Sequence, residues 1–210
     1  MNDFEPVTKL GTIVLALAAH PSVPAKNVRD LIAHAKANPG KLSFGAGSSS
    51  SRLAGEMHKT LAGIDIVHVA YRSNPQAITD LLGGHIQLIF ADLSTTLPQV
   101  KDGKLTGLGV SSRQRTPLAP DLPTMVEAGV PGHEMTAWFA AFTPAKTPRP
   151  VVDQLQTALH AALADKPTTD RMLAAGIEAE KSSPAELKAF VLSETKKWAD
   201  IVKAAGIQPE

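Results

Sequence analysis

Residues 42–57, LSFGAGSSSSRLAGEM, change character twice within a short stretch and so decide the fold prediction. An apolar run ends at Gly45, serines occupy positions 48–51, and apolar residues resume at Leu53. This order is typical of a strand, a tight turn and the start of a helix. We expect Gly45 and Gly47 to turn the backbone through its left-handed region, which is open to glycine because it lacks a Cβ atom.

The corner between this strand and this helix has two open interpretations. The first amides of a helix have no partner within the helix and lie at the positive end of its dipole, so they can hold a carboxylate or a phosphate. The hydroxyls of residues 48–51 would add donors to such a site. Serine is equally suited to capping a helix in a surface loop. The stretch alone does not choose between an anion site and a plain cap.

Strands and helices alternate in the same way over residues 12–111. Asn27 is a typical N-cap, and Asn74-Pro75 predicts an N-cap followed by proline at the first helical position. Such alternation predicts a mostly parallel sheet with helices on both faces, whose ligands bind where the carboxyl ends of the strands meet. We expect strands at 12–19, 66–69, 85–90 and 105–110. The helices should end at 38–40, 63 and 83–84, and a short helix should span 95–100. The loops 45–50, 71–74 and 91–94 should then lie close together at one edge of the sheet.

Three further side chains are candidates for ligand contacts. Arg72 follows a predicted strand and could pair bidentately with a carboxylate, or could be an ordinary surface arginine. Asp92, at the end of the next strand, could orient a ligand hydroxyl or ammonium group, or could simply start a turn. Trp138 could line a cleft with its indole N–H as a donor, or could anchor a core.

The chain changes character after an irregular, proline-rich connection at 113–123. One strand is expected at 135–142, followed by amphipathic helices at 151–162, 168–175 and 184–204. Helices with apolar faces must bury them, but this part of the sequence supplies few strands for them to cover. We therefore expect these helices to expose apolar surface and to promote self-association.

Composition and motifs exclude several classes of function. The net charge of +1 gives no overall field to attract nucleic acid or an anionic membrane, and the absence of cysteine excludes disulfides and thiolate chemistry. GAGSSS lacks the third glycine of a dinucleotide site, and the sequence has no Walker lysine, nucleophile elbow or paired-histidine metal motif. We predict no catalytic residue, no metal and no cofactor. No run is long enough to span a bilayer, and none has the flanks of a signal peptide.

Several stretches together resemble the substrate-binding proteins of tripartite tricarboxylate transporters, the Bug or TctC family. They are LSFGAGSSSSRLAGEM, HVAYRSNPQAITDLLGG (68–84), LAPDLPTMVEAGVPG (118–132) and WADIVKAAGIQPE (198–210). The resemblance implies a periplasmic-binding-protein-like α/β fold of type II, with a parallel-rich sheet flanked by helices. It also implies capture of a small carboxylate (a di- or tricarboxylate, an amino acid or an aromatic acid), delivery to membrane permease subunits, and no catalysed reaction.

Family members have a further N-terminal part that builds most of the first lobe. We therefore expect residues 1–10 to be a residual inter-lobe segment, 11–123 an intact lobe, and 124–210 the return crossover and the helical share of an incomplete lobe. Such a chain should bind ligand weakly or not at all. The family implies the periplasm, whereas a chain translated as written, without a signal peptide, would stay in the cytoplasm. By the resemblance, the residues at the family's ligand-binding positions are Gly45, Gly47, Ser48, Ser49, Ser50, Arg72, Ser73, Asn74, Asp92 and Trp138. In this set Arg72 stands where the family usually has lysine, and Asn74-Pro75 departs from the family's usual sequence.

Two other classes of function stay open. A sensor or interaction protein outside transport could use the same fold. An enzyme that handles acyl or phosphoryl groups could use the glycine and serine corner, but it would need a base or a metal cluster near Ser48, and the sequence suggests none.

Overall fold

The computed structural model describes residues 3–206, and the chain divides into two compact units. Unit 1 contains the residues before Val14 and those from Ala137 to Asp200, and unit 2 contains Val14–Thr136 and the residues from Ile201 onward. The predicted assignment of 1–10, 11–123 and 124–210 to parts of the family's lobes stays a prediction. Its outermost residues, 1–2 and 207–210, lie outside the described part of the chain.

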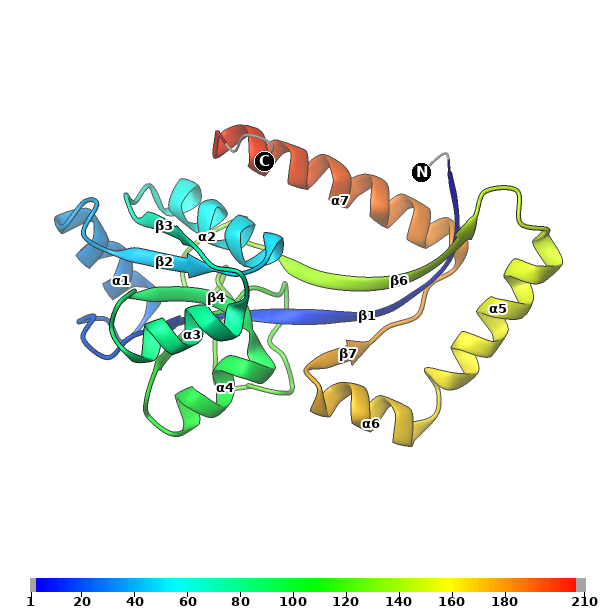
Figure 1. Cartoon of the computed structure of the whole chain (residues 1–210), viewed down its shortest axis with the longest axis horizontal. Coiled ribbons are helices and arrows are strands. Elements are labelled where there is room, and N and C mark those ends of the chain that lie inside the picture. The colour runs from blue at the N-terminus through cyan, green and yellow to red at the C-terminus, as the bar shows by residue number, and fades with distance from the viewer. Residues whose placement is uncertain (1–2, 207–210) are drawn as a thin grey trace. The chain divides into compact units, whose positions relative to one another are not determined.

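Strand β1 (Phe4–Ala19) begins in unit 1 and ends in unit 2 (Figure 1). Its second half enters the sheet of unit 2, whose other strands alternate with helices as the sequence predicts. These elements are α1 (Val28–Ala37), β2 (Ser43–Ala46), α2 (Ser49–Ala62), β3 (Val67–Ala70), α3 (Asn74–Leu82), β4 (Leu88–Asp92), α4 (Leu93–Lys101) and β5 (Thr106–Val110).

The sheet of unit 2 has the strand order β3-β2-β4-β1-β5. β2 is parallel to both β3 and β4, whereas β1 is antiparallel to both β4 and β5. Strands β2 to β5 therefore share one direction, which confirms the parallel-rich α/β sheet. The antiparallel direction of β1 was not predicted. Alternating strands and helices indicate parallel neighbours, but they do not give the direction of a strand that enters the sheet from another unit.

Helix ends follow the local signals in most places. The Asn27 side chain caps α1 by accepting from the Asp30 amide, and Gly63 ends α2 in the left-handed conformation. The predicted N-cap at Asn74 is wrong by one position, because Ser73 occupies the cap and Asn74 is the first residue of α3. The predicted strand at 85–90 lies at Leu88–Asp92 instead, because the His85 amide still bonds to the Asp80 carbonyl at the end of α3.

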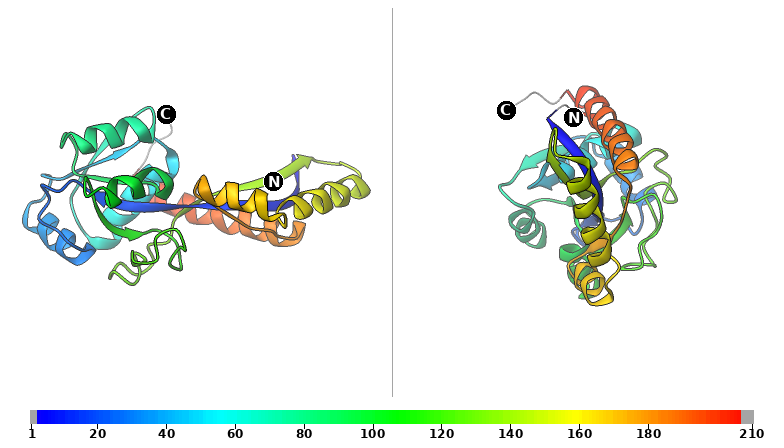
Figure 2. Two further views of the ribbon diagram at one scale, coloured as in Figure 1. Left: turned by 90° about the horizontal axis from the view of Figure 1, so that it is seen from below. Right: turned by 90° about the vertical axis from the view of Figure 1, so that its right-hand side faces the viewer.

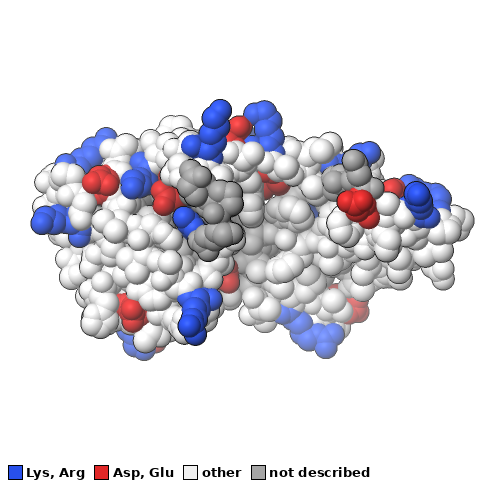
Figure 3. All heavy atoms as spheres, turned by 45° about the horizontal axis from the view of Figure 1, so that its top comes forward, with Lys and Arg blue, Asp and Glu red and all other residues white. Residues whose placement is uncertain are grey.

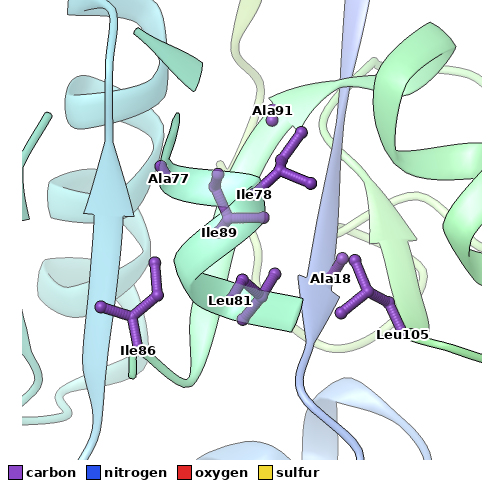
Figure 4. Close-up of a cluster of buried hydrophobic side chains, with 8 residues drawn as sticks. All are labelled: Ala18, Ala77, Ile78, Leu81, Ile86, Ile89, Ala91 and Leu105. Atoms are coloured by element: carbon purple, nitrogen blue, oxygen red, sulfur yellow. The ribbon is translucent and has the colours of Figure 1, made fainter. Parts of the chain in front are cut away.

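Side chains of β4 alternate between the two faces of this sheet. Ile89 and Ala91 pack with Leu81 of α3 in one apolar cluster, which Figure 4 shows. Phe90 points the other way and its ring lies 5.7 Å from that of His58 in α2. Helices therefore cover both faces, as expected for a parallel-rich sheet, and each fully buried isoleucine or leucine contributes about 1.5–3 kcal/mol.

Unit 1 has a much smaller apolar core. Here β6 (Thr136–Pro144) and β7 (Ile177–Ala179) pair with β1, and the helices are α5 (Arg149–Ala162), α6 (Lys166–Ala174) and α7 (Pro184–Ala204). Figure 2 shows α5 and α6 in yellow and orange, one following the other. Among the described residues of α5 and α6 only Val152 is buried, whereas α7 buries Leu187 and Glu194. The predicted shortage of sheet beneath the three helices stays a prediction.

No helix within residues 3–206 is both long and apolar enough to cross a lipid bilayer.

Candidate functional site

A hollow of about 220 Å³ opens in unit 2 beside the last residues of β2 and β3 and the first turn of α2. The strand ends and the helix start meet there because β2 and β3 are parallel neighbours. Three of the predicted site residues, Gly47, Ser48 and Ser49, line it. The full lining is Ala46, Gly47, Ser48, Ser49, Arg52, His68, Ala70 and Tyr71.

The two glycines before the hollow serve close packing instead of a left-handed turn. Neither Gly45 nor Gly47 has a positive φ, so the expected backbone conformation is wrong. A Cβ atom on Gly45 would lie 2.4 Å from a methyl carbon of Ile86, and one on Gly47 would lie 1.9 Å from the backbone carbonyl carbon of Ser73. Only a residue without a side chain lets the loop after β2 approach the loop after β3 this closely.

The serines of this loop have different roles. Ser48 is the N-cap of α2, and its Oγ accepts a hydrogen bond of 3.2 Å from the Ser51 amide. The Ser51 side chain is fully buried and its hydroxyl donates to the Phe90 carbonyl of β4. Ser50 lies within 3.2 Å of Ser48, oxygen to oxygen, but does not line the hollow. By helix geometry the amides of Ser49 and Ser50 have no hydrogen-bond partner within α2.

The arginine that lines the hollow is Arg52. The predicted Arg72 is exposed and is not one of the lining residues, and ligand contact by Arg72 stays a prediction. Arg52 was not considered in the sequence, although it follows Ser48 by four positions and Ser49 by three, so all three share one face of α2. Helical spacing was therefore the signal that could have found it.

Asn74 and Tyr71 are committed to bonds within the protein. Asn74 is only 7% exposed, and its Oδ1 accepts from the Gly47 amide at 2.9 Å. The Tyr71 hydroxyl donates to Asp80 Oδ2 at 2.7 Å; burial, followed by this hydrogen bond, raises the pKa of Tyr71 to about 12. Neither Asn74 nor its neighbour Ser73 lines the hollow, and direct ligand contact by either stays a prediction.

Asp92 and Trp138 lie elsewhere. Asp92 occupies the N-cap position of α4 without a capping hydrogen bond from its side chain, and burial raises the pKa of its carboxyl group. Trp138 belongs to unit 1, where it lines a separate hollow of about 270 Å³ with Glu194, Thr195 and Trp198. Its ring meets that of Phe190 edge to face at 5.3 Å. Neither Asp92 nor Trp138 lines the hollow at the start of α2, and ligand contact by either stays a prediction.

The hollow combines a cationic side chain with the start of a helix. Arg52 is a cation, the start of α2 contributes the positive end of its dipole, and the first turn of α2 contains no acidic residue. No aspartate or glutamate is among the lining residues. On the face drawn in Figure 3, by contrast, basic and acidic side chains are interspersed. Within residues 3–206 no group of three or more potential ligands is arranged to hold a metal ion.

A parallel-rich sheet covered by helices on both faces is the fold of periplasmic binding proteins. Residues 1–207 match the family described as the tripartite tricarboxylate transporter family receptor, and the chain belongs to this family. A protein of Bordetella pertussis, BugT, is 28% identical over 208 residues, which cover 98% of this chain and 64% of BugT. A second Bordetella pertussis protein of the UPF0065 group is 30% identical, and the match covers 100% of this chain and 66% of that protein. The chain thus spans somewhat less than two thirds of these relatives.

Solved structures give the same assignment. The R. palustris protein Rpa4515, determined with adipate, is 32% identical with a TM-score of 0.87, over 100% of this chain and 71% of that one. The periplasmic binding protein BugD is 32% identical with a TM-score of 0.83, over 99% of this chain and 71% of that one. MatC of Rhodopseudomonas palustris, with bound malate, is 25% identical with a TM-score of 0.80, over 95% of this chain and 69% of that one. The periplasmic-binding-protein fold is confirmed.

Proposed function

We propose that the chain acts as a solute receptor and that the hollow at the start of α2 holds a carboxylate group of a small organic acid. The observation that carries this proposal is the donor set. Arg52, the hydroxyls of Ser48 and Ser49 and the first amides of α2 surround one space that contains no acidic side chain. Hydrogen bonds from charged donors to a carboxylate are the strong ones, and a helix start favours an anion.

The relatives support a dicarboxylate as the ligand. Adipate and malate, the acids named with Rpa4515 and MatC, each carry two carboxylates. We propose that this chain binds acids of the same class in the periplasm, passes them to permease subunits of a tripartite transporter, and catalyses no reaction. Because the chain spans 61–66% of its first curated relatives, we expect it to bind these acids only weakly by itself.

Weak binding calls for a titration followed by NMR. Adipate and malate are added to the isotopically labelled chain at constant ionic strength, and hexane-1,6-diol serves as an uncharged control for adipate. We expect shifts in the amides of residues 47–52 with the acids and none with the diol. Shifts that are absent from this loop, or equal with the diol, would contradict the proposal. Micromolar affinity would contradict the expected weakness but not the site.

Arg52→Gln and Arg72→Gln form a matched pair, since both remove one cation from unit 2. Loss of a charge-assisted hydrogen bond costs about 1.5–3 kcal/mol, so Arg52→Gln should raise the dissociation constant about tenfold or more. Arg72→Gln should change it by less than about twofold, as expected for a screened surface charge. A larger rise in the dissociation constant for Arg72→Gln than for Arg52→Gln would identify Arg72 as the ligand-binding arginine.

A further inference from the structure

Asn74 joins two loops that are far apart in the sequence. It is a buried polar residue at the first position of α3, and both atoms of its amide group point to the loop that precedes α2. Oδ1 accepts from the Gly47 amide at 2.9 Å, and Nδ2 donates to Ser48 Oγ at 3.4 Å. The Gly47 N–H can only donate, so it fixes which end of the Asn74 amide is the oxygen.

The two loops are in backbone contact at this point. A Cβ atom on Gly47 would lie 2.2 Å from the Asn74 nitrogen, and the Tyr71 amide donates to the Ala46 carbonyl at 2.9 Å. The position of the Ser48 hydroxyl is therefore set by the loop after β3 as well as by its own helix.

These contacts decide the hydrogen-bonding polarity of Ser48. A hydroxyl group has two acceptor lone pairs and one donor hydrogen. Ser48 Oγ accepts from the Ser51 amide and from the Asn74 side chain, so both lone pairs are occupied. The Ser48 hydroxyl can therefore form one more hydrogen bond, as a donor. Its hydrogen can be donated to Ser50 Oγ, 3.2 Å away, or to an acceptor in the hollow that Ser48 lines.

We infer that Asn74 is a positioning residue that makes the Ser48 hydroxyl a donor and so fits the hollow to ligand oxygens that only accept, such as those of a carboxylate. This inference rests on the proposed function of the hollow. In this inference Asn74 does not contact the ligand itself and acts on it through the Ser48 hydroxyl.

Two substitutions separate this role from a structural one. Asn74→Ala removes both hydrogen bonds to the loop. Asn74→Asp keeps an acceptor for the Gly47 amide, but its carboxylate can only accept from Ser48, which reverses the polarity of that hydroxyl. Asn27→Ala is the control, because Asn27 also serves the start of a helix in unit 2, accepting from the Asp30 amide at 2.9 Å, but does not line the hollow.

Each variant is studied as the full chain by thermal unfolding, by hydrogen exchange of the Gly47 amide and by titration with malate. We expect Asn74→Ala to lose Gly47 protection and to weaken malate binding about fivefold to tenfold, the effect of one net hydrogen bond. Asn74→Asp should keep Gly47 protection and still weaken binding at least as much. Asn27→Ala should lower the unfolding temperature by a similar amount and leave malate binding unchanged.

Either of two results would overturn the inference: full malate binding by Asn74→Asp, or full Gly47 protection in Asn74→Ala. If Asn74→Ala does not fold, Asn74→Asp alone decides, because it should keep the loop in place. A wild-type chain that gives no shifts with malate would refute the proposed function and this inference together. Wild-type binding that both Asn74 variants retain would refute only the inference.

Discussion

At the scale of single residues, the core of unit 2 contains two buried histidines. His58 and His133 are each 0% exposed, and their rings lie 5.7 Å apart. The His133 ring stacks on that of Phe90 at 5.1 Å, and its Nε2 lies 3.1 Å from the Ala54 carbonyl oxygen, so this nitrogen carries the hydrogen of the neutral ring. Burial lowers the pKa of His58 to about 3, helped by His133, and that of His133 to about 4.

These pKa values predict that stability falls in acid. Below the ordinary histidine pKa of 6.5 the unfolded chain binds protons at both rings, whereas the folded chain does not until about pH 4 and then about pH 3. The free energy of unfolding is therefore unaffected by this pair above pH 6.5 and decreases below it, by up to about 1.4 kcal/mol per pH unit for each histidine. Urea unfolding at pH 7 and at pH 5 should show the loss.

One variant tests whether the buried pair causes this loss. His58→Leu should remove about half of the difference between pH 7 and pH 5, because one of the two buried titrating groups is gone. Equal stability of the wild-type chain at the two pH values would contradict the prediction.

At the scale of elements, the sequence predicts best where a local signal acts alone. Asn27 and Gly63 bound their helices as expected, because a cap depends on residues within one turn. The first half of β1 and the short β7 were missed, because each is a strand only through pairing with distant parts of the sequence: β1 pairs with β6 and β7. The role of Asn74 was missed for the same reason, since its partners lie 26 and 27 positions earlier.

The run of serines before α2 gives an element-scale prediction. Ser51 anchors α2 to β4 through the Phe90 carbonyl from a fully buried position, whereas Ser50 lies nearer the surface. Ser51→Ala should lower the free energy of unfolding by about 1 kcal/mol, and Ser50→Ala by less than about 0.5 kcal/mol. Thermal or urea unfolding of the two variants measures this contrast. Equal losses would mean that Ser51 does not join the helix to the strand.

At the scale of the whole molecule, the helices of unit 1 expose more large apolar side chains than the helices of unit 2 do. Val151 and Leu155 are 43% and 41% exposed one turn apart on α5, and Leu192 of α7 is 54% exposed. Apolar surface of this kind favours association between chains. We expect light scattering to give a mass above that of one chain, rising with concentration.

The double variant Val151→Glu, Leu155→Lys should shift this equilibrium toward single chains. Leu61→Glu is the matched control, because Leu61 is 45% exposed but belongs to unit 2. A monomer at every concentration, or an equal effect of the control, would exclude α5 as the associating surface.

Strand β1 also constrains how this chain can vary. In its second half the large side chains, Leu15 and Leu17, alternate with the small ones, Ala16 and Ala18, and all four are buried. The small residues belong to the clusters that contain Leu93 and α3, so the leucines occupy the opposite face. Inserting or deleting one residue near Ile13 would leave the strand just as apolar, but it would move the leucines to the face that the alanines now occupy and the alanines to the other. One face would then be overpacked and the other would contain cavities. Length variants should therefore be tolerated in the loop 20–27 that follows β1 and not within the strand.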